Sequence, residues 1–296
     1  MTMVRSEPAW APVSGSGIAV LAGRDDERPA ALRAGAMVLP LDRRVARRSA
    51  VVGLEVAVTA RLLDLLPAPP TAVVVVPSEV DFAAHVAEVG RVACGLFHMD
   101  GQDPVLTVGV ACPYPVAPET TEDLNLYNMH LEALPEALVE SVAAARRLNL
   151  ATANGSCVLL LQRFAPPKAS AVVQASPNRR LPVRISGRWG LTEASLSEVP
   201  ADEFEVAPDG RGVTEKLAWK PTANVTAHGG TRTVDLSERC RYQSSLSRGT
   251  VLRLAALARN AAVAAGRPLT LDVAMLNDRP VVLRCRPCAR EAFPVR

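Results

Sequence analysis

With 296 residues, the chain is long enough for one large domain or for two closely packed lobes, and its 49% of apolar residues can bury a substantial core. The 33 basic and 30 acidic residues leave a formal net charge of +3, which argues against a nucleic-acid or membrane-surface binder. No segment has the length of a membrane span, and the N-terminus carries no signal-peptide hydrophobic segment. We therefore expect a cytoplasmic protein in which residues 1–17 form a flexible leader.

The first half of the chain alternates short apolar runs with patterns of helical periodicity. The apolar runs predict strands, and they fall at residues 18–21, 37–40, 71–76 and 106–111. Apolar residues at helical spacing predict helices over residues 29–34, 51–66, 81–92 and 136–148. We assign this half, residues 18–150, to an N-terminal lobe.

The second half changes character and predicts mainly short strands separated by Pro, Gly and Asn turns. These strands fall at residues 157–164, 170–173, 183–186, 204–206, 213–220, 269–275 and 280–285. One helix is expected over residues 250–265, with Gly266 at its end, and the last two strands are joined by a turn at Asn277-Asp278. We assign residues 151–296 to a C-terminal lobe and predict an α+β fold with mostly antiparallel pairing.

The six cysteines are spread along the chain, unlike a compact disulfide framework. Cys285 and Cys288 have the spacing of a redox or metal-binding pair, but the sequence offers no second such pair and no nearby pair of histidines. We interpret both as reduced, structural thiols.

Several segments of the second half resemble one protein family. Residues 271–287, Leu-Asp-Val-Ala-Met-Leu-Asn-Asp-Arg-Pro-Val-Val-Leu-Arg-Cys-Arg-Pro, are similar to the closing strand pair of the ATP-grasp nucleotide-binding domain of phosphoenolpyruvate synthases and pyruvate phosphate dikinases. Residues 188–194, Arg-Trp-Gly-Leu-Thr-Glu-Ala, resemble the Trp-Gly-Leu-Gly-Glu-Ala segment of that family. Residues 200–206 resemble its Pro-Asp-x-Phe-x-Val segment, and residues 158–164 resemble its strand before the adenine hinge.

This resemblance implies an ATP-grasp-like fold in which two lobes enclose a nucleotide cleft. It also implies a kinase-type subunit that binds ATP and Mg²⁺ and passes a phosphoryl group to a histidine on a separate swivelling protein. Arg24 and Arg286 are then the catalytic residues that hold phosphates, and Asp272 is the metal ligand. The other nucleotide-binding residues implied by the resemblance are Gln162, Glu193, Lys220 and Arg284.

The sequence departs from the family pattern at several of these positions. Gly109 stands where the family has a phosphate-binding arginine, and Arg284 replaces a metal-binding glutamine and so brings a cation to the expected Mg²⁺ site. Arg24 replaces a lysine, with a planar fork in place of a compact ammonium.

Each residue also has a purely structural interpretation. Arg24 could be a surface arginine, Glu193 could cap a segment, and Lys220 could be a solvated strand residue. Arg284 and Arg286 alternate along one strand and could pair with Asp272 or Asp278.

Two main hypotheses follow. In the first, the chain is an ATP-dependent phosphotransferase subunit of the dikinase type. In the second, it is a catalytically inactive ATP-grasp relative that acts as a binding or regulatory subunit, which the departures at Gly109 and Arg284 favour. A third hypothesis, a small-molecule phosphotransferase related to antibiotic-inactivating enzymes, would require a histidine domain that this sequence does not contain.

Overall fold

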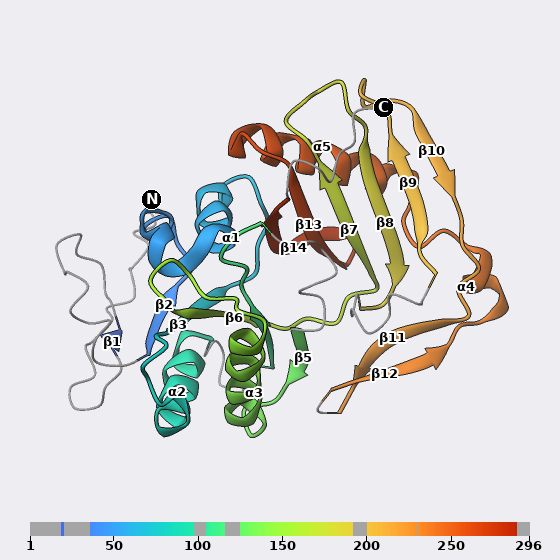
Figure 1. Ribbon diagram of the computed structural model, residues 1–296. Coiled ribbons are helices and arrows are strands. Elements are labelled where there is room, and N and C mark those ends of the chain that lie inside the picture. Colours follow the sequence, from blue (N-terminus) through green and yellow to red (C-terminus); the bar gives the residue numbers. More distant parts are fainter. Residues whose placement is uncertain are drawn as a thin grey trace, which may run out of the picture.

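The computed structural model describes residues 36–97, 105–115, 125–191, 200–228 and 230–288, together with the backbone of β1, Ala19–Val20. The described chain contains two six-stranded sheets with helices packed on them, and a separate two-stranded hairpin (Figure 1). Among the strands that the structure describes, β1 and β2 pair in parallel and all other pairs are antiparallel. The predicted α+β class with mostly antiparallel sheets is confirmed.

The first sheet has the strand order β1-β2-β3-β6-β4-β5. After β1 its strands are β2 (Met37–Pro40), β3 (Thr71–Val76), β4 (Leu106–Val110), β5 (Asn125–Met129) and β6 (Cys157–Arg163). Helix α1 (Ser49–Leu62) and the short helix η2 (Val45–Arg48) cover one face; the short helix η3 (Phe82–Ala84) and helices α2 (Val86–Phe97) and α3 (Leu134–Arg147) cover the other. Every residue of β3 is buried, because both faces of this strand are covered.

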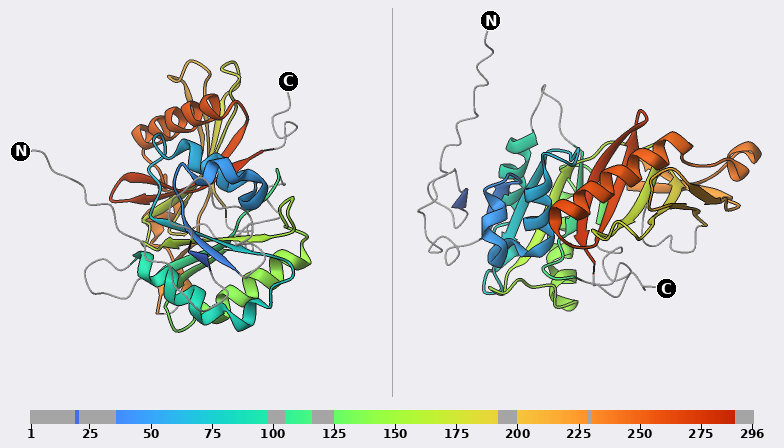
Figure 2. Two further views of the ribbon diagram at one scale, coloured as in Figure 1. Left: turned by 90° about the vertical axis from the view of Figure 1, so that its left-hand side faces the viewer. Right: turned by 90° about the horizontal axis from the view of Figure 1, so that it is seen from above.

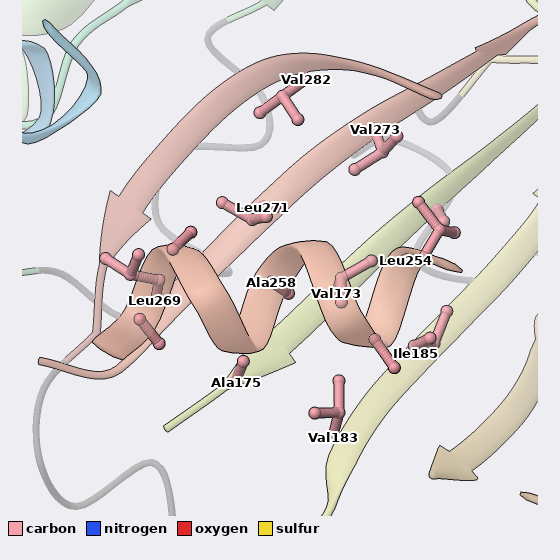
Figure 3. Packing of buried hydrophobic residues seen from close by; sticks show 14 of the residues in the cluster. Val173, Ala175, Val183, Ile185, Leu254, Ala258, Leu269, Leu271, Val273 and Val282 are labelled. Atoms are coloured by element: carbon pink, nitrogen blue, oxygen red, sulfur yellow. The ribbon is translucent and has the colours of Figure 1, made fainter. Parts of the chain in front are cut away.

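The second sheet has the strand order β10-β9-β8-β7-β13-β14. Its strands are β7 (Ala169–Ala175), β8 (Val183–Trp189), β9 (Asp202–Val206), β10 (Val213–Lys216), β13 (Leu269–Leu276) and β14 (Arg279–Pro287). Helix α5 (Arg248–Ala265) packs across it, and Leu254 and Ala258 meet Val173, Ile185 and Leu271 in a common core (Figure 3).

The sequence explains why α5 forms where it does. Ser247 caps its first turn by accepting a hydrogen bond from the backbone N–H of Thr250, and Gly266 ends it in the left-handed conformation with φ of 65°. The left view of Figure 2 shows α5 above and the α2–α3 pair below, with the sheets and α1 between them.

Strand β14 forms the junction between the two sheets. The backbone N–H of Val282 donates to the carbonyl of Pro67, and the side chain of Gln162 donates to the carbonyl of Leu283 at 2.7 Å. Strand β6 pairs with β3 and β4, so it belongs to the first sheet, although we expected a lobe boundary at residue 150. By sheet membership, the division falls between Arg163 at the end of β6 and Ala169 at the start of β7. The apolar run of β6 predicts a strand but does not reveal which sheet that strand joins.

Helix α1 differs from the continuous helix expected over residues 51–66. It breaks at Gly53, whose φ of 78° is favourable only for glycine and whose Cα faces the backbone of Pro113 closely. After the break, the backbone N–H groups of Leu54 and Glu55 donate to the carbonyls of Pro113 and Cys112. This break directs the side chain of Glu55 into the interior, where it is completely buried.

The sequence analysis did not predict β5, the hairpin formed by β11 (Thr222–Ala227) and β12 (Gly230–Asp235), or the short helix α4 (Glu238–Tyr242). These strands contain few buried apolar residues, so their patterns lack the alternation of a half-buried strand. The predicted strand over residues 213–220 is also shorter in the structure, since β10 ends at Lys216 and Lys220 lies in a loop.

Candidate functional site

A cleft lies between the two sheets, beside the segment that connects β6 to β7. Its apolar wall includes Phe164, Pro167 and Leu191. Seven polar or charged side chains also line it: Thr107, Asn125, Tyr127, Arg163, Ser170, Asp272 and Arg286. A mostly apolar cavity with a few convergent polar groups has the composition of a small-molecule site. Its cavity volume is only about 40 Å³, so a nucleotide requires the cleft to open.

Strands β13 and β14 bring Asp272, Arg284 and Arg286 together. Asp272 lies directly opposite Arg284 in the antiparallel register, and Arg286 follows two residues later on the same face. Nη2 of Arg286 donates to Oδ1 of Asp272 at 2.7 Å, and both side chains line the cleft. The structural interpretation, in which an arginine of this strand pairs with Asp272, is therefore correct for Arg286.

Arg284 is buried at the junction between the sheets and is not among the residues that line the cleft. Its Nε donates to Oε1 of Glu55 and its Nη2 to Oε2 of Glu55, both at 2.7 Å. Nη2 also donates to the carbonyl of Val110 at 2.8 Å, and Nη1 donates to Oδ1 of Asn125 at 3.2 Å. The expectation that Arg284 brings a cation to the Mg²⁺ site stays a prediction, and the structure adds that Glu55 pairs with this guanidinium.

The pair of Glu55 and Arg284 perturbs the pKa of both groups. Burial alone raises the pKa of Glu55, but the charge and hydrogen bonds of Arg284 and the backbone N–H of Cys112 outweigh burial and lower it below its usual value. Burial lowers the pKa of Arg284, and the carboxylate of Glu55 more than reverses this and raises it. Both groups therefore remain charged in the interior.

Gly109 explains part of this arrangement. A Cβ atom at this position would lie 2.5 Å from Oδ1 of Asn125, the atom that accepts a hydrogen bond from Arg284. A side chain at residue 109, such as the arginine that the family resemblance implies there, would displace Asn125. The two departures from the family pattern, Gly109 and Arg284, thus belong to one packed group of residues.

Lys220 and Asp202 form a second buried ion pair, remote from the cleft lining. Nζ of Lys220 donates to Oδ1 of Asp202, and the two side chains are 1% and 0% exposed. The other carboxylate oxygen of Asp202 accepts from the backbone N–H and the hydroxyl of Ser245, both at 2.8 Å. The interpretation of Lys220 as a solvated strand residue is corrected, because the group joins β9, the loop after β10 and the start of α5.

Gln162 is also buried, and it bridges the sheets rather than lining the cleft. Its Nε2 donates to Oγ1 of Thr71 at 3.1 Å and to the carbonyl of Leu283 at 2.7 Å. Arg24 and Glu193 lie outside the described residues, so their predicted roles stay predictions. Of the predicted site residues within the described ranges, only Asp272 and Arg286 line the cleft.

The described residues contain no group of three or more His, Cys, Asp or Glu side chains placed to hold a metal ion. Asp272 is the one carboxylate in the described lining of the cleft, and it already accepts a hydrogen bond from Arg286. The cleft lining thus offers one carboxylate where the family resemblance implies a carboxylate and a glutamine, so a Mg²⁺ ion here would take its other oxygen ligands from water and bound phosphates.

A second hollow, with a cavity volume of about 270 Å³, lies at the start of α5. Lys168, Trp189 and Asp278 line it together with residues 243–247. Although this hollow is larger, none of the predicted site residues lines it, and it touches only the second sheet and its loops. The smaller cleft between the sheets is therefore the better candidate site.

The cysteine thiols of the described chain form no disulfide. Burial raises the pKa of the thiols of Cys285 and Cys288, which opposes the thiolate form needed for redox or metal chemistry. Within the described part of the chain, no helix is both long and apolar enough to traverse a bilayer.

The sequence analysis missed Glu55 and Asn125. Glu55 is the one acidic residue in the apolar run of α1, and a charge at such a position requires a buried partner. The sequence therefore contained a signal that Glu55 is buried with a partner. Asn125 begins a strand that the sequence did not predict, so nothing in the local pattern indicated it.

No family model matches this chain, and no curated protein matches its sequence. Solved structures that are similar include PH1788 from Pyrococcus horikoshii Ot3, at 10% identity and a TM-score of 0.46, over 83% of this chain and 98% of the other. A dinucleotide-forming acetyl-coenzyme A synthetase 1 from Ca. Korarchaeum cryptofilum is 13% identical at a TM-score of 0.38, over 80% of this chain and 93% of the other. The D-alanine-D-alanine ligase from Coxiella burnetii is 9% identical at a TM-score of 0.35.

The match to the ligase covers 78% of this chain but only 46% of the ligase. Because all three TM-scores lie below 0.5, these similarities carry no argument about the activity of this chain.

Proposed function

We propose that the chain is an ATP-grasp-like nucleotide-binding protein that holds the phosphates of ATP at Arg286 and does not transfer them. The observation that carries this proposal is the ion pair of Arg286 and Asp272 in the cleft. The other arginine of the strand, Arg284, is bound by Glu55 and is not among the lining residues. The motif resemblance of residues 158–164 and 271–287 supports the choice of ATP as the ligand.

The charges of the site favour binding over catalysis. Arg284 and Arg286 are each matched by one buried or half-buried carboxylate, Glu55 and Asp272. Phosphoryl transfer needs cations to cover the phosphate oxygens and hard ligands to hold Mg²⁺ between them. Arg286 is the one guanidinium of the closing strand pair in the described lining of the cleft, and a guanidinium suits phosphate binding because its planar fork matches two phosphate oxygens.

The apolar wall supports the other end of the ligand. Phe164 and Pro167 lie on the connection between the sheets, and Leu191 faces them from the end of β8. A nucleoside can pack against such surfaces while its phosphates reach Arg286. Binding also requires the cleft to open beyond its volume of about 40 Å³, which movement of one sheet relative to the other would provide.

A second candidate is the dikinase-type subunit that passes phosphate to a histidine-bearing partner. Asp272 favours it, because its side chain is 19% exposed in the cleft and Mg²⁺ is often bound by one or two carboxylates together with substrate phosphates. In this alternative Asp272 leaves Arg286 when the metal and nucleotide bind.

The two candidates differ in the effect of Asp272→Asn on ATP affinity. Isothermal titration calorimetry with ATP, with and without Mg²⁺, should be performed on the wild type, Asp272→Asn and Arg286→Gln. Arg184→Gln is the matched control, because Arg184 forms an exposed ion pair with Glu205 in the same sheet.

If the chain binds without catalysing, Arg286→Gln weakens binding about tenfold or more, since a hydrogen bond to a charged group contributes about 1.5–3 kcal/mol. Asp272→Asn then strengthens binding, because it removes a negative charge beside the phosphates, and Mg²⁺ has little effect. If Asp272 instead binds Mg²⁺, Asp272→Asn weakens binding only when Mg²⁺ is present. Unchanged binding in Arg286→Gln, or no binding of ATP by the wild type, would contradict the proposed function.

A further inference from the structure

The hairpin β11–β12, here called the strap, connects two walls of the cleft. At one end the backbone N–H of Leu191, which lines the cleft, donates to the carbonyl of Asn224 on β11 at 2.9 Å. At its tip the strap reaches β5, whose Asn125 and Tyr127 also line the cleft (Figure 1). The strap thus connects Leu191, which follows β8 of the second sheet, to β5 of the first sheet.

Asn128 of β5 fixes the tip of the strap. Its Nδ2 group donates to the carbonyl of Gly230 at 2.7 Å and to the carbonyl of Ala227, so it binds the chain on both sides of His228. Asn128 is buried and has a φ of 57°, a left-handed conformation that costs free energy in a residue other than glycine. The backbone of β5 is therefore shaped to meet the strap.

Two histidines meet beside this contact. His130 follows β5, His228 lies at the tip of the strap, and their ring centroids are 5.3 Å apart with an angle of 43° between the rings. His228 is exposed and His130 is half-buried, so the pair lies at the protein surface. Two imidazoles bound to one zinc ion at about 2.0–2.1 Å, at roughly a tetrahedral angle, place their ring centroids about 5 Å apart.

We propose that His130 and His228 form a binding site for a divalent transition-metal ion that fastens the strap to the first sheet. Neutral imidazole nitrogens suit Zn²⁺, Ni²⁺ and Cu²⁺, whereas Mg²⁺ and Ca²⁺ require oxygen ligands. Two protein ligands leave the other coordination positions to water, so the bound ion is exchangeable. The site is separate from the ATP site of the proposed function and does not depend on it.

A simple packing contact between two histidine rings has the same centroid separation without any metal. The position of this pair favours a metal site for two reasons. The rings come from segments almost a hundred residues apart in the chain, and they meet where Asn128 already holds the strap in register. A metal ion bound there would add a third connection to the two hydrogen bonds of Asn128. The attachment of the strap to β5 would then depend on the metal concentration.

The test titrates the reduced 296-residue chain with Zn²⁺ by calorimetry, for the wild type, His130→Ala and His228→Ala. His85→Ala is the matched control, since His85 is also half-buried but lies in the turn before α2, within the first lobe. Hydrogen exchange of the backbone amides of residues 222–235 is measured in the same samples, with and without Zn²⁺. Neither measurement involves a nucleotide.

We expect one zinc ion to bind per wild-type chain, and this binding to be lost in His130→Ala and in His228→Ala but kept in His85→Ala. We expect Zn²⁺ to slow exchange in the strap of the wild type and of His85→Ala only. Retention of the site in either His130→Ala or His228→Ala would overturn the assignment of ligands. Exchange in the strap that does not change with Zn²⁺ would overturn its role as a fastening.

Discussion

Arg284 of β14 and Glu55 of α1 form a buried, bidentate ion pair that joins the two sheets. Both N–O distances are 2.7 Å, and the side chains are 5% and 0% exposed. Because the guanidinium also donates to the carbonyl of Val110 and to Asn125, one side chain of the second sheet binds α1, β4 and β5. The relative position of the two cleft walls therefore depends on this pair.

Removal of Arg284 should destabilise the fold strongly. Arg284→Met leaves Glu55 charged and buried without its partner, which costs about 3–5 kcal/mol of unfolding free energy. The double variant with Glu55→Gln should cost clearly less than the sum of the single changes, because no uncompensated charge remains. Urea unfolding followed by circular dichroism measures these values. Arg184→Met, at an exposed ion pair, is the control and should change stability by less than about 1 kcal/mol.

The same pair predicts how stability depends on pH. The folded pKa of Glu55 is lowered, so its contribution is fully present above the unfolded value of about 4.3 and is lost as the pH falls through the folded pKa. Unfolding free energies measured from pH 7 to pH 3 should therefore decline more steeply below about pH 4.3 in the wild type than in Glu55→Gln. Parallel curves for the two proteins would show that Glu55 titrates normally.

Gly109 should tolerate no side chain while Asn125 keeps its position. The Cβ of Gly109→Ala would lie 2.5 Å from Oδ1 of Asn125, and relief of this clash should cost about 1–3 kcal/mol. The same substitution in an Asn125→Ala background should cost much less. Gly249→Ala is the control, because its Cβ would lie 4.0 Å from the nearest atom, Oγ of Ser247. Equal losses from Gly109→Ala in both backgrounds would exclude the clash as the cause.

Lys220 should affect stability and not nucleotide binding. Lys220→Met leaves the carboxylate of Asp202 buried without its cation, and we expect a loss of about 3–5 kcal/mol in urea unfolding. The ATP affinity of the folded fraction should stay unchanged, because Lys220 does not line the cleft. Weaker ATP binding with an unchanged unfolding midpoint would instead assign Lys220 to the nucleotide site.

Local sequence patterns predicted the elements that build the core. The apolar runs of β3 and β6 and the capped, periodic segment of α5 report burial directly, since a run of apolar side chains must leave water wherever it packs. The turn at Asn277-Asp278 sets the register of β13 and β14 as far as Val273 and Val282, and a β-bulge between Asp272 and Val273 then pairs Asp272 with Arg284. The strand pair was predictable from the sequence, but the bulge that brings these side chains to one face was not.

Only the tertiary structure decided what each charge meets. A local pattern shows that Glu55 or Lys220 is a charge within its segment, but its partner lies on a distant element, at Arg284 and Asp202 respectively. The polar strands β5, β11 and β12 are likewise held by partners rather than by their own burial pattern, as Asn128 and the strap illustrate. Hydrophobic periodicity is a local property of the chain, whereas the pairing of buried charges and of polar strands depends on which surfaces the folded chain brings together.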